Sequence, residues 1–367
     1  MRKQLLIGLA AATIAVTALA GCSSARTDSG SSTTVKKGDT IGVALPAKTS
    51  QNWVLAKASF ESALTKAGFK ADVQYAAATN TVPDQQNQIS SMITKGDKVI
   101  IIAAQDGSQL GTQVAAAKKA GITVIAWDRN ILNTKNVDFY VAFNNYKVGQ
   151  LQAQALLDGM KAKKSTGPYN IEIFAGSSTD ANATVFYNGA MSVLQPEIDK
   201  KNVIVPSGQT TFQQVNTADW DPKNSQTRMS NLITSTYAGG TELDGVLSPN
   251  DTLGRSIITA VQAAGLPVPI VTGQDSETAS IPLIMQGIQY STIYKNTDDE
   301  AQAAVKVVSA LAAGKTPDGV DKNDKVNAGN GVITVPYVAL TPVLITKDNA
   351  VEAYANNPTL EALAKKG

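Results

Sequence analysis

Apolar and polar positions alternate along this chain in a rhythm that begins near residue 40. Short apolar runs are separated by longer segments with helical spacing, as in the series Trp53, Ala56, Phe60 and Leu64. The run Val99–Ile102 is apolar on both faces, which is typical of a strand buried between helices in a parallel sheet. In the first half the pattern predicts strands over 41–45, 72–76, 99–103, 123–127 and 139–143.

The same rhythm restarts in the second half of the chain. It predicts strands over 170–175, 203–205, 245–247 and 269–271, and helices over 184–194, 224–235 and 252–264. Gly68 and Gly121 stand where two helices of the first half are expected to end. Two sheets of the βαβ type in one chain are therefore predicted, each with loops at the carboxyl ends of its strands.

Polar and charged residues gather at those strand ends. They occupy the stretches 46–53, 127–129, 177–182, 250–251 and 274–275. The carboxyl ends of parallel strands share one edge of a sheet, which is where open α/β sheets bind ligands. A structural protein has no need for polar groups there, so the pattern favours a two-lobed protein that closes on a small polar ligand.

The first 22 residues have the form of an export signal. Arg2 and Lys3 precede an apolar stretch over 5–20, and small residues lead to Cys22, the only cysteine in 367 residues. Leu19-Ala20-Gly21-Cys22 resembles the lipobox of bacterial lipoproteins, which implies a lipidated Cys22 on the outer face of a membrane. The alternatives are a plain signal peptide or an uncleaved anchor, and the apolar run is shorter than the ~20 residues of a spanning helix.

A polar stretch separates this signal from the folded body. Residues 23–38 are dominated by Ser, Thr, Gly and charged residues, a composition typical of flexible coil. We therefore expect a signal peptide over 1–21, a tether over 22–38 and a body from 39 onward. A body of that length suits two domains of about 150 residues each.

Composition excludes several classes of function. The chain has no histidine, a single cysteine and a formal net charge of +2. These counts remove Ser-His-Asp and Cys-His catalysis, the usual zinc sites and a basic surface for nucleic acid. No cofactor and no metal are expected, and the acidic stretch 321–324 lacks the Gly and Glu of a calcium loop. An enzyme that uses carboxylates or lysine would survive this test.

Seven segments, in their order along the chain, resemble the type I periplasmic sugar-binding proteins. They are 43–53, 126–129 (Ala-Trp-Asp-Arg), 143–145, 217–222, 248–251 (Ser-Pro-Asn-Asp), 272–277 and 290–295. The resemblance is to the branch that binds galactose, glucose, xylose and related sugars for ABC importers. It implies an α/β fold of two Rossmann-like lobes, with parallel sheets flanked by helices, joined by a three-strand hinge. It also implies an aldose pyranose ligand, with fructose or arabinose as further options.

The resemblance implies three crossings between the lobes. Lobe one would hold 39–143 and 277–332, and lobe two 144–276 and 333–367. The hinge strands would then lie near 143–144, 274–276 and 332–335. Periodicity alone does not indicate the third crossing.

Five charged residues are implied as ligand contacts. Asp128 and Arg129 end a predicted buried strand, and the resemblance implies that the carboxylate accepts from two sugar hydroxyls while the guanidinium donates to others. Such hydrogen bonds to charged groups contribute roughly 1.5–3 kcal/mol each. Asp275 would bind ring hydroxyls, and Lys48 and Lys295 would donate to hydroxyls or the ring oxygen. The alternatives are a salt bridge between the lobes for the first pair and solvated surface groups for the lysines.

Two tryptophans are candidates for stacking on the sugar. The C–H face of a pyranose packs on an aromatic ring without competing for its hydroxyls. The resemblance places Trp53 and Trp220 in this role, whereas Trp53 has the alternative of a core residue on its helix.

Amide and further acidic side chains complete the implied contact set. They are Asn52, Asn144, Asn145, Asp180, Asn182, Asn250 and Asp251. Asp251 has the alternative role of a helix N-cap, and which member of each pair contacts the ligand stays open. Several relatives carry an arginine where this chain has Thr184, so the resemblance defines the contacts of lobe two less well.

The leading hypothesis is a lipid-anchored monomeric receptor that closes on a monosaccharide and presents it to an ABC permease. A signalling receptor that presents the sugar to a sensor kinase would use the same closed form. A surface enzyme with Asp128 and Asp275 as an acid–base pair is the rival from another class. A repressor of similar shape would carry a helix-turn-helix where this chain has its signal and tether.

Overall fold

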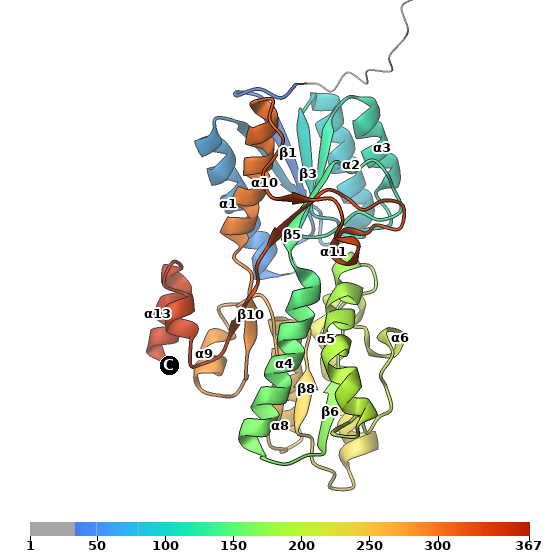
Figure 1. Cartoon of the computed structure of the whole chain (residues 1–367), viewed down its shortest axis with the longest axis vertical. Coiled ribbons are helices and arrows are strands. Elements are labelled where there is room, and N and C mark those ends of the chain that lie inside the picture. Colours follow the sequence, from blue (N-terminus) through green and yellow to red (C-terminus); the bar gives the residue numbers. More distant parts are fainter. Residues whose placement is uncertain (1–33, 49, 80) are drawn as a thin grey trace, which may run out of the picture. The chain divides into compact units, whose positions relative to one another are not determined.

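The computed structural model describes residues 34–48, 50–79 and 81–367 (Figure 1). The expected signal peptide, Cys22 and the tether up to residue 33 lie outside the described residues. Val35 is only 4% exposed and packs in the core of the first lobe, and the Gly38 amide donates to the Gly68 carbonyl at 2.8 Å. The expected tether, 22–38, therefore extends too far toward the C-terminus, because the side chain of Val35 already packs in the folded body.

A seven-stranded sheet forms the centre of the first lobe. Its order is β11-β12-β5-β4-β3-β1-β2, and only the β11–β12 pair is antiparallel. The strands are β1 (Thr40–Leu45), β2 (Lys70–Tyr75), β3 (Val99–Ile102), β4 (Thr123–Trp127), β5 (Phe139–Phe143), β11 (Val320–Asp321) and β12 (Tyr337–Leu340). The five strands predicted in the first half are confirmed, each within two residues of its expected ends.

Helices cover both faces of this sheet, as the apolar run in β3 predicts. They are α1 (Gln51–Ala67), α2 (Thr81–Lys95), α3 (Gly111–Lys119) and α10 (Thr297–Ala312), with the short α11 (Lys325–Ala328) near the hinge. Val99 and Ile101 pack with α1 and α10, while Ile100 and Ile102 pack with α2 and α3. Figure 1 shows the two helix pairs on opposite sides of the strands. Helix α1 ends, as expected, at Gly68 in a left-handed conformation with φ 85°.

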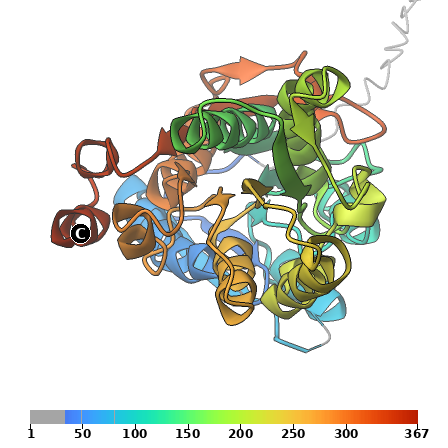
Figure 2. The ribbon, with the colours of Figure 1, turned by 90° about the horizontal axis from the view of Figure 1, so that it is seen from below.

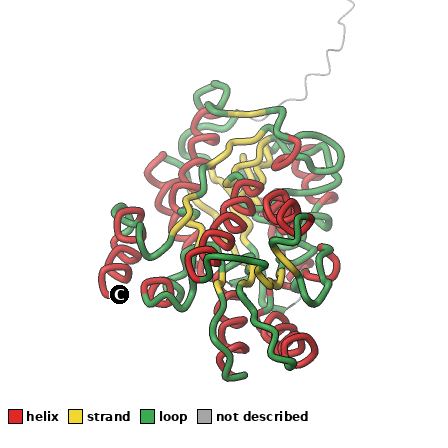
Figure 3. The backbone as a smooth tube through the Cα atoms, turned by 60° about the horizontal axis from the view of Figure 1, so that its bottom comes forward, coloured by secondary structure: helices red, strands yellow, loops and turns green. Residues whose placement is uncertain are grey.

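The second lobe is built on a four-stranded parallel sheet. Its order is β7-β6-β8-β9. The strands are β6 (Tyr169–Ile173), β7 (Val203–Ile204), β8 (Gly245–Leu247) and β9 (Ile270–Val271). The strands of both sheets lie between layers of helices (Figure 3). The doubly covered α/β fold predicted for both halves is confirmed.

Four long helices flank the second sheet. They are α4 (Asn145–Lys163), α5 (Ala181–Asp199), α7 (Pro222–Leu232) and α8 (Asp251–Ala263). In Figure 2, α4 and α5 (green and yellow-green) lie on one face and α7 and α8 (yellow to gold) on the other. Short helical turns occur at α6 (Phe212–Val215), η1 (Ala218–Trp220) and η2 (Ile233–Tyr237).

A small layer at the C-terminal end packs against the second lobe. Strands β10 (Thr292–Tyr294) and β13 (Val343–Ile345) pair antiparallel there. The helices of this layer are α9 (Ile281–Met285), α12 (Ala350–Ala353) and α13 (Pro358–Lys366). Ile281, Ile345 and Tyr354 are fully buried together in its core. No helix of the described residues has the length and apolar character that crossing a bilayer requires.

The chain crosses between the lobes at other places than the resemblance implies, apart from the first. β5 leads into α4 at Phe143, as expected. The second crossing lies between β10 and α10, because the Asp275 amide donates to the Ile293 carbonyl at 2.8 Å and thereby keeps this stretch with lobe two. The expected hinge at 274–276, and the placement of 277–294 in lobe one, are wrong.

The third crossing lies between β12 and β13. β12 runs parallel to β5 with Tyr337 opposite Tyr140, and the two rings stack with centroids 5.2 Å apart. This pairing continues the sheet beyond β5 and keeps 333–340 in lobe one. The expected hinge at 332–335 therefore precedes the actual crossing.

Candidate ligand-binding site

A cavity of about 310 Å³ opens between the two lobes, at the carboxyl ends of both sheets. Its volume is at the lower end of the range of small-molecule sites. Of the predicted residues, the first lobe contributes Asn52, Trp53, Asp128 and Arg129, and the second crossing contributes Lys295. The second lobe contributes Asp180, Asn182, Trp220, Asn250 and Asp275.

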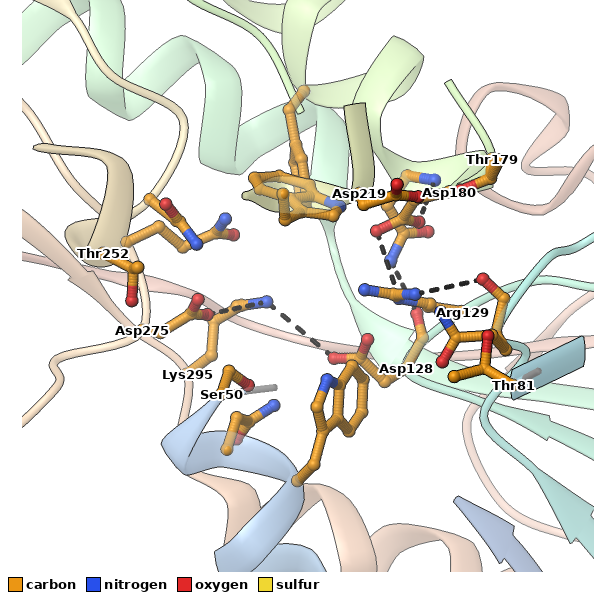
Figure 4. Close-up of a pocket in the computed structure, with 18 of the residues that line it drawn as sticks. Ser50, Thr81, Asp128, Arg129, Thr179, Asp180, Asp219, Thr252, Asp275 and Lys295 are labelled. Carbon is orange, nitrogen blue, oxygen red and sulfur yellow. Dashed lines mark hydrogen bonds and ion pairs between the residues drawn. The ribbon is translucent and has the colours of Figure 1, made fainter. Parts of the chain in front are cut away.

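Lys295 links the carboxylates of the two lobes. Its Nζ lies 3.2 Å from Asp275 Oδ1 and 3.8 Å from Asp128 Oδ2, and the residue is 9% exposed (Figure 4). Burial alone lowers the pKa of Lys295, but the two carboxylates raise it above its ordinary value, so the ammonium stays charged. Burial raises the pKa of Asp128, while Lys295 and Arg129 oppose that rise. One cation shared by two acids leaves acceptor capacity for ligand hydroxyls.

Both acids have left-handed backbone conformations in the segments that follow their strands. Asp128 follows β4 with φ 57°, and Asp275, beyond the end of β9, has φ 92°. Such left-handed conformations cost on the order of 1–3 kcal/mol each and cluster at functional sites. The Tyr140 hydroxyl donates to the Asp128 carbonyl at 2.8 Å and helps to hold this turn. The turns are therefore fixed so that the carboxylates face the cavity.

Arg129 lies between an aromatic ring and an acid of the other lobe. Its Nε is 3.1 Å from Asp180 Oδ2, and its guanidinium lies 5.0 Å from the centroid of the Trp53 ring. The interlobe salt bridge that was the alternative for Arg129 is thus present. The group also lines the cavity, so the pair leaves room for ligand contact as well.

The two predicted tryptophans differ in their surroundings: Trp53 belongs to the core of lobe one, and Trp220 lies in a turn of lobe two. Trp53 is buried in the lobe-one core, edge-on to Trp127 at 6.3 Å, and its ring also reaches the cavity. Trp53 is thus a core residue that also lines the cavity, and its stacking on the sugar stays a prediction. Trp220 lies on the second lobe in a turn where it and Asp219 have φ 54° and 57°. A Cβ on Gly176 would lie 2.0 Å from Trp220 Cζ2, so the indole rests directly on the Gly176 backbone.

Three predicted residues lie outside the cavity lining. Lys48 is exposed, with its Nζ 4.8 Å from the centroid of the Tyr75 ring. Asn144 is the N-cap of α4 and accepts from the Lys147 amide at 2.8 Å. Asn145 is buried, and its Nδ2 donates to the Tyr140 hydroxyl at 3.3 Å. The cavity lining does not include these three side chains, so the expected ligand contacts of Lys48 and of an asparagine at the hinge stay predictions.

Asp251 also lies outside the lining. It is completely buried and accepts from the Glu277 amide at 2.9 Å, the Gln289 amide group at 2.8 Å and the Thr292 hydroxyl at 3.0 Å. Burial raises its pKa well above the ordinary value. Asn250 is the residue that caps α8, through the Leu253 amide, and it lines the cavity. Asp251 therefore holds the stretch 277–292 that leads to the second crossing, and Asn250 is the candidate ligand contact.

Several lining residues were not named as individual candidates, although Ser50, Thr179 and Gln274 lie in the polar stretches expected at the ligand edge. The full set is Ser50, Ala78, Thr81, Gln105, Thr179, Phe186, Asp219, Thr252 and Gln274. Asp219 and Gln274 lie inside segments that carry the resemblance, and Gln105 follows the strand β3, so position could have indicated them. Phe186 stands one helical turn after Asn182, and that spacing was its only signal. Within the described part of the chain, no group of acidic, His or Cys side chains is arranged to hold a metal.

Comparison with known proteins identifies the family of this chain. Residues 41–316 match the family model described as periplasmic binding protein domain. The multiple sugar-binding periplasmic receptor ChvE of Rhizobium radiobacter is 45% identical over 315 residues, covering 84% of this chain and 87% of that protein. The D-xylose-binding periplasmic protein of Escherichia coli (strain K12) is 33% identical over 310 residues, covering 84% and 87%.

A solved structure has the same fold. The ABC transporter solute binding protein from Clostridium phytofermentans with bound beta-D-glucose is 38% identical, with a TM-score of 0.82, covering 88% of this chain and 100% of that chain. The chain therefore belongs to the periplasmic binding protein family, in the type I sugar-binding group whose resemblance its sequence carries.

Proposed function

We propose that this protein captures a monosaccharide by closure of its two lobes and delivers it to an ABC transporter. The observation that carries the proposal is the interlobe cavity in which Lys295 joins Asp128 of one lobe to Asp275 of the other. The relatives named as sugar receptors, and the neighbour with bound glucose, support the choice of ligand class. We propose an aldose pyranose such as galactose, glucose or xylose.

The lining residues supply the groups that a sugar needs. Asp128 and Asp275 accept from vicinal hydroxyls, while Arg129 and Lys295 donate, and charged partners make such hydrogen bonds about twice as strong as neutral ones. Trp220 and Trp53 line the cavity and offer apolar surface to the C–H face of the ring. Asn52 and Asn250 add amide groups at opposite walls.

Closure follows from the division of these groups between the lobes. A ligand that contacts both lobes binds the closed form more tightly than the open form, and so shifts the equilibrium toward closure. The closed form is what a permease would recognise, and no bond of the sugar changes. We propose that the protein acts as a monomer.

We also propose that Cys22 is lipidated and holds the protein on the outer face of the cell membrane. Because the chain has one cysteine, labelling with a palmitate analogue in a bacterial host reports on this residue alone. The wild type should be labelled and sediment with membranes, while Cys22→Ser should be unlabelled. Label that persists in Cys22→Ser would contradict the anchor.

A calorimetric and thermal-shift screen against monosaccharides tests the main proposal. At least one aldose should raise the melting temperature, and Asp128→Ala should abolish that rise. The same mixtures, analysed for products, separate a receptor from an enzyme that uses Asp128 and Asp275, since turnover would establish the enzyme. No shift with any sugar would refute sugar capture. Measuring sugar uptake in cells that lack the protein distinguishes transport from presentation to a sensor kinase, because only a transport role predicts that uptake falls.

A further inference from the structure

The segment at the start of α5 binds the opposite lobe directly. The Gly107 amide of lobe one donates to the Thr179 carbonyl at 3.2 Å, and Arg129 pairs with Asp180 at 3.1 Å. In Figure 4, Thr179 and Asp180 lie on the Arg129 side of the cavity, away from Asp275 and Lys295. Because these contacts join protein to protein, they contribute to closure whatever the ligand is.

Asn182 makes the most central of these contacts. Its Nδ2 donates to the Asp128 carbonyl at 2.8 Å, and its Oδ1 accepts from the Tyr140 hydroxyl at 3.0 Å. The side chain is 3% exposed. Both ends of the amide therefore face lobe one: Nδ2 meets the turn that presents the Asp128 carboxylate, and Oδ1 meets Tyr140 of β5.

The contact partners are themselves held in place. The single proton of the Tyr140 hydroxyl is shared between the Asp128 carbonyl at 2.8 Å and Asn182 Oδ1 at 3.0 Å, so this three-centred contact joins residues of both lobes. Asp180 caps α5 by accepting from the Asn182 amide at 2.9 Å. The start of α5 is therefore a preformed element that meets a fixed turn of lobe one.

On this geometry we propose that Asn182 is a positioning residue that holds the lobes closed, rather than a residue that selects the sugar. The inference rests on the proposed sugar-binding function. Its two hydrogen bonds form with lobe one in the closed state and break when the lobes separate. Their contribution is therefore the same in every closed complex, and the apparent affinity for each sugar changes with the closed population by one common factor.

The test compares Asn182→Ala with wild type against a panel of sugars. Alanine keeps the helix start, because it is the best helix former. Loss of two neutral hydrogen bonds should weaken binding by about five- to a hundredfold, by the same factor for every sugar of the panel. Small-angle scattering of the unliganded variant should give a larger radius of gyration than wild type, because the variant has lost contacts that hold the lobes together.

Two further variants serve as controls. Asn188→Ala makes the same change at an exposed position on the same helix and should leave affinity and radius unchanged. Trp220→Ala removes a side chain of the cavity wall that belongs to one lobe. It should lower the affinity for different sugars by unequal factors and leave the radius of gyration of the unliganded protein as in wild type.

The outcomes separate this inference from the proposed function. Losses in Asn182→Ala that differ from sugar to sugar by more than about threefold would make it a selective contact and overturn the inference. An unchanged radius together with unchanged affinities would also overturn it. If wild type binds no sugar, the proposed function fails, and the scattering comparison of the two unliganded proteins still decides whether Asn182 holds the lobes together.

Discussion

Replacing Gly176 by alanine should drive the indole of Trp220 from its place in the cavity wall. A Cβ at Gly176 would lie 2.0 Å from Cζ2 and 2.2 Å from Cη2 of the indole, well inside contact distance. The backbone cannot retreat easily, because the Ala175 amide donates to the Val215 carbonyl at 2.9 Å and the Thr217 amide donates to the Ala175 carbonyl at 3.0 Å. The ring must therefore move.

The size of the effect follows from packing. An extra methyl group that forces a side chain to shift costs about 1–3 kcal/mol of folding stability. If Trp220 stacks on the sugar as proposed, an indole displaced from the wall loses that contact; aromatic pairs, taken as a guide, contribute about 0.5–1.5 kcal/mol beyond the buried area. Since 1.4 kcal/mol is a factor of ten, Gly176→Ala should weaken sugar binding by roughly tenfold or more.

Calorimetric titration and urea unfolding measure the two effects. Gly111→Ala is the matched control, because no atom lies within 4 Å of its added Cβ, and it should leave affinity unchanged. In the background of Trp220→Ala, the alanine at 176 should cause little further loss of affinity, since it acts through the ring. Wild-type affinity in Gly176→Ala would refute this reasoning.

Two further predictions concern buried charges. Lys295→Met leaves the carboxylates of Asp128 and Asp275 without their shared cation, so the free energy of unfolding, measured in urea at pH 7, should fall by about 3–5 kcal/mol. Lys295→Arg keeps a cation and should lower it by less. Equal stability of Lys295→Met and wild type would contradict the stabilising role of the two ion pairs of Lys295. Burial and then Asp72 raise the pKa of Asp97 from 3.8 to about 6, so its contribution to stability is full below pH 3.8 and is lost as the pH rises through 6. Asp97→Asn should flatten the dependence of the unfolding free energy on pH in this window, and an unchanged slope would show that Asp97 does not titrate there.

Much of the architecture is a local property of the chain. The strands β4, β5 and β8 have the ends that periodicity predicts, because alternate apolar side chains must find cover on both faces of a parallel sheet. The position of Asp128 just beyond β4 was likewise readable, since strand ends of a parallel sheet share an edge. For the same reason Asp275, in the segment after β9, was a correct candidate for the cavity.

The resemblance, rather than periodicity, indicated that the chain crosses three times between the lobes. It placed two crossings too early. Whether 277–294 stays with lobe two depends on hydrogen bonds such as that from the Asp275 amide to the Ile293 carbonyl of β10. No local sequence pattern predicts that these two residues are partners. The pairing of β12 with β5 joins residues nearly 200 positions apart, for example Tyr337 and Tyr140.

For the polar side chains too, the sequence determined their place along the chain, and the tertiary structure decided what each one contacts. The sequence by itself determined two α/β lobes, and it determined that polar groups gather at the ends of their strands. Only the tertiary structure decided that Asp251 turns into a buried network, that Asn250 faces the cavity and that Asn182 binds the opposite lobe. The physical reason is that secondary structure follows from neighbours along the chain. A polar side chain instead takes its role from the partners that folding brings within about 3 Å.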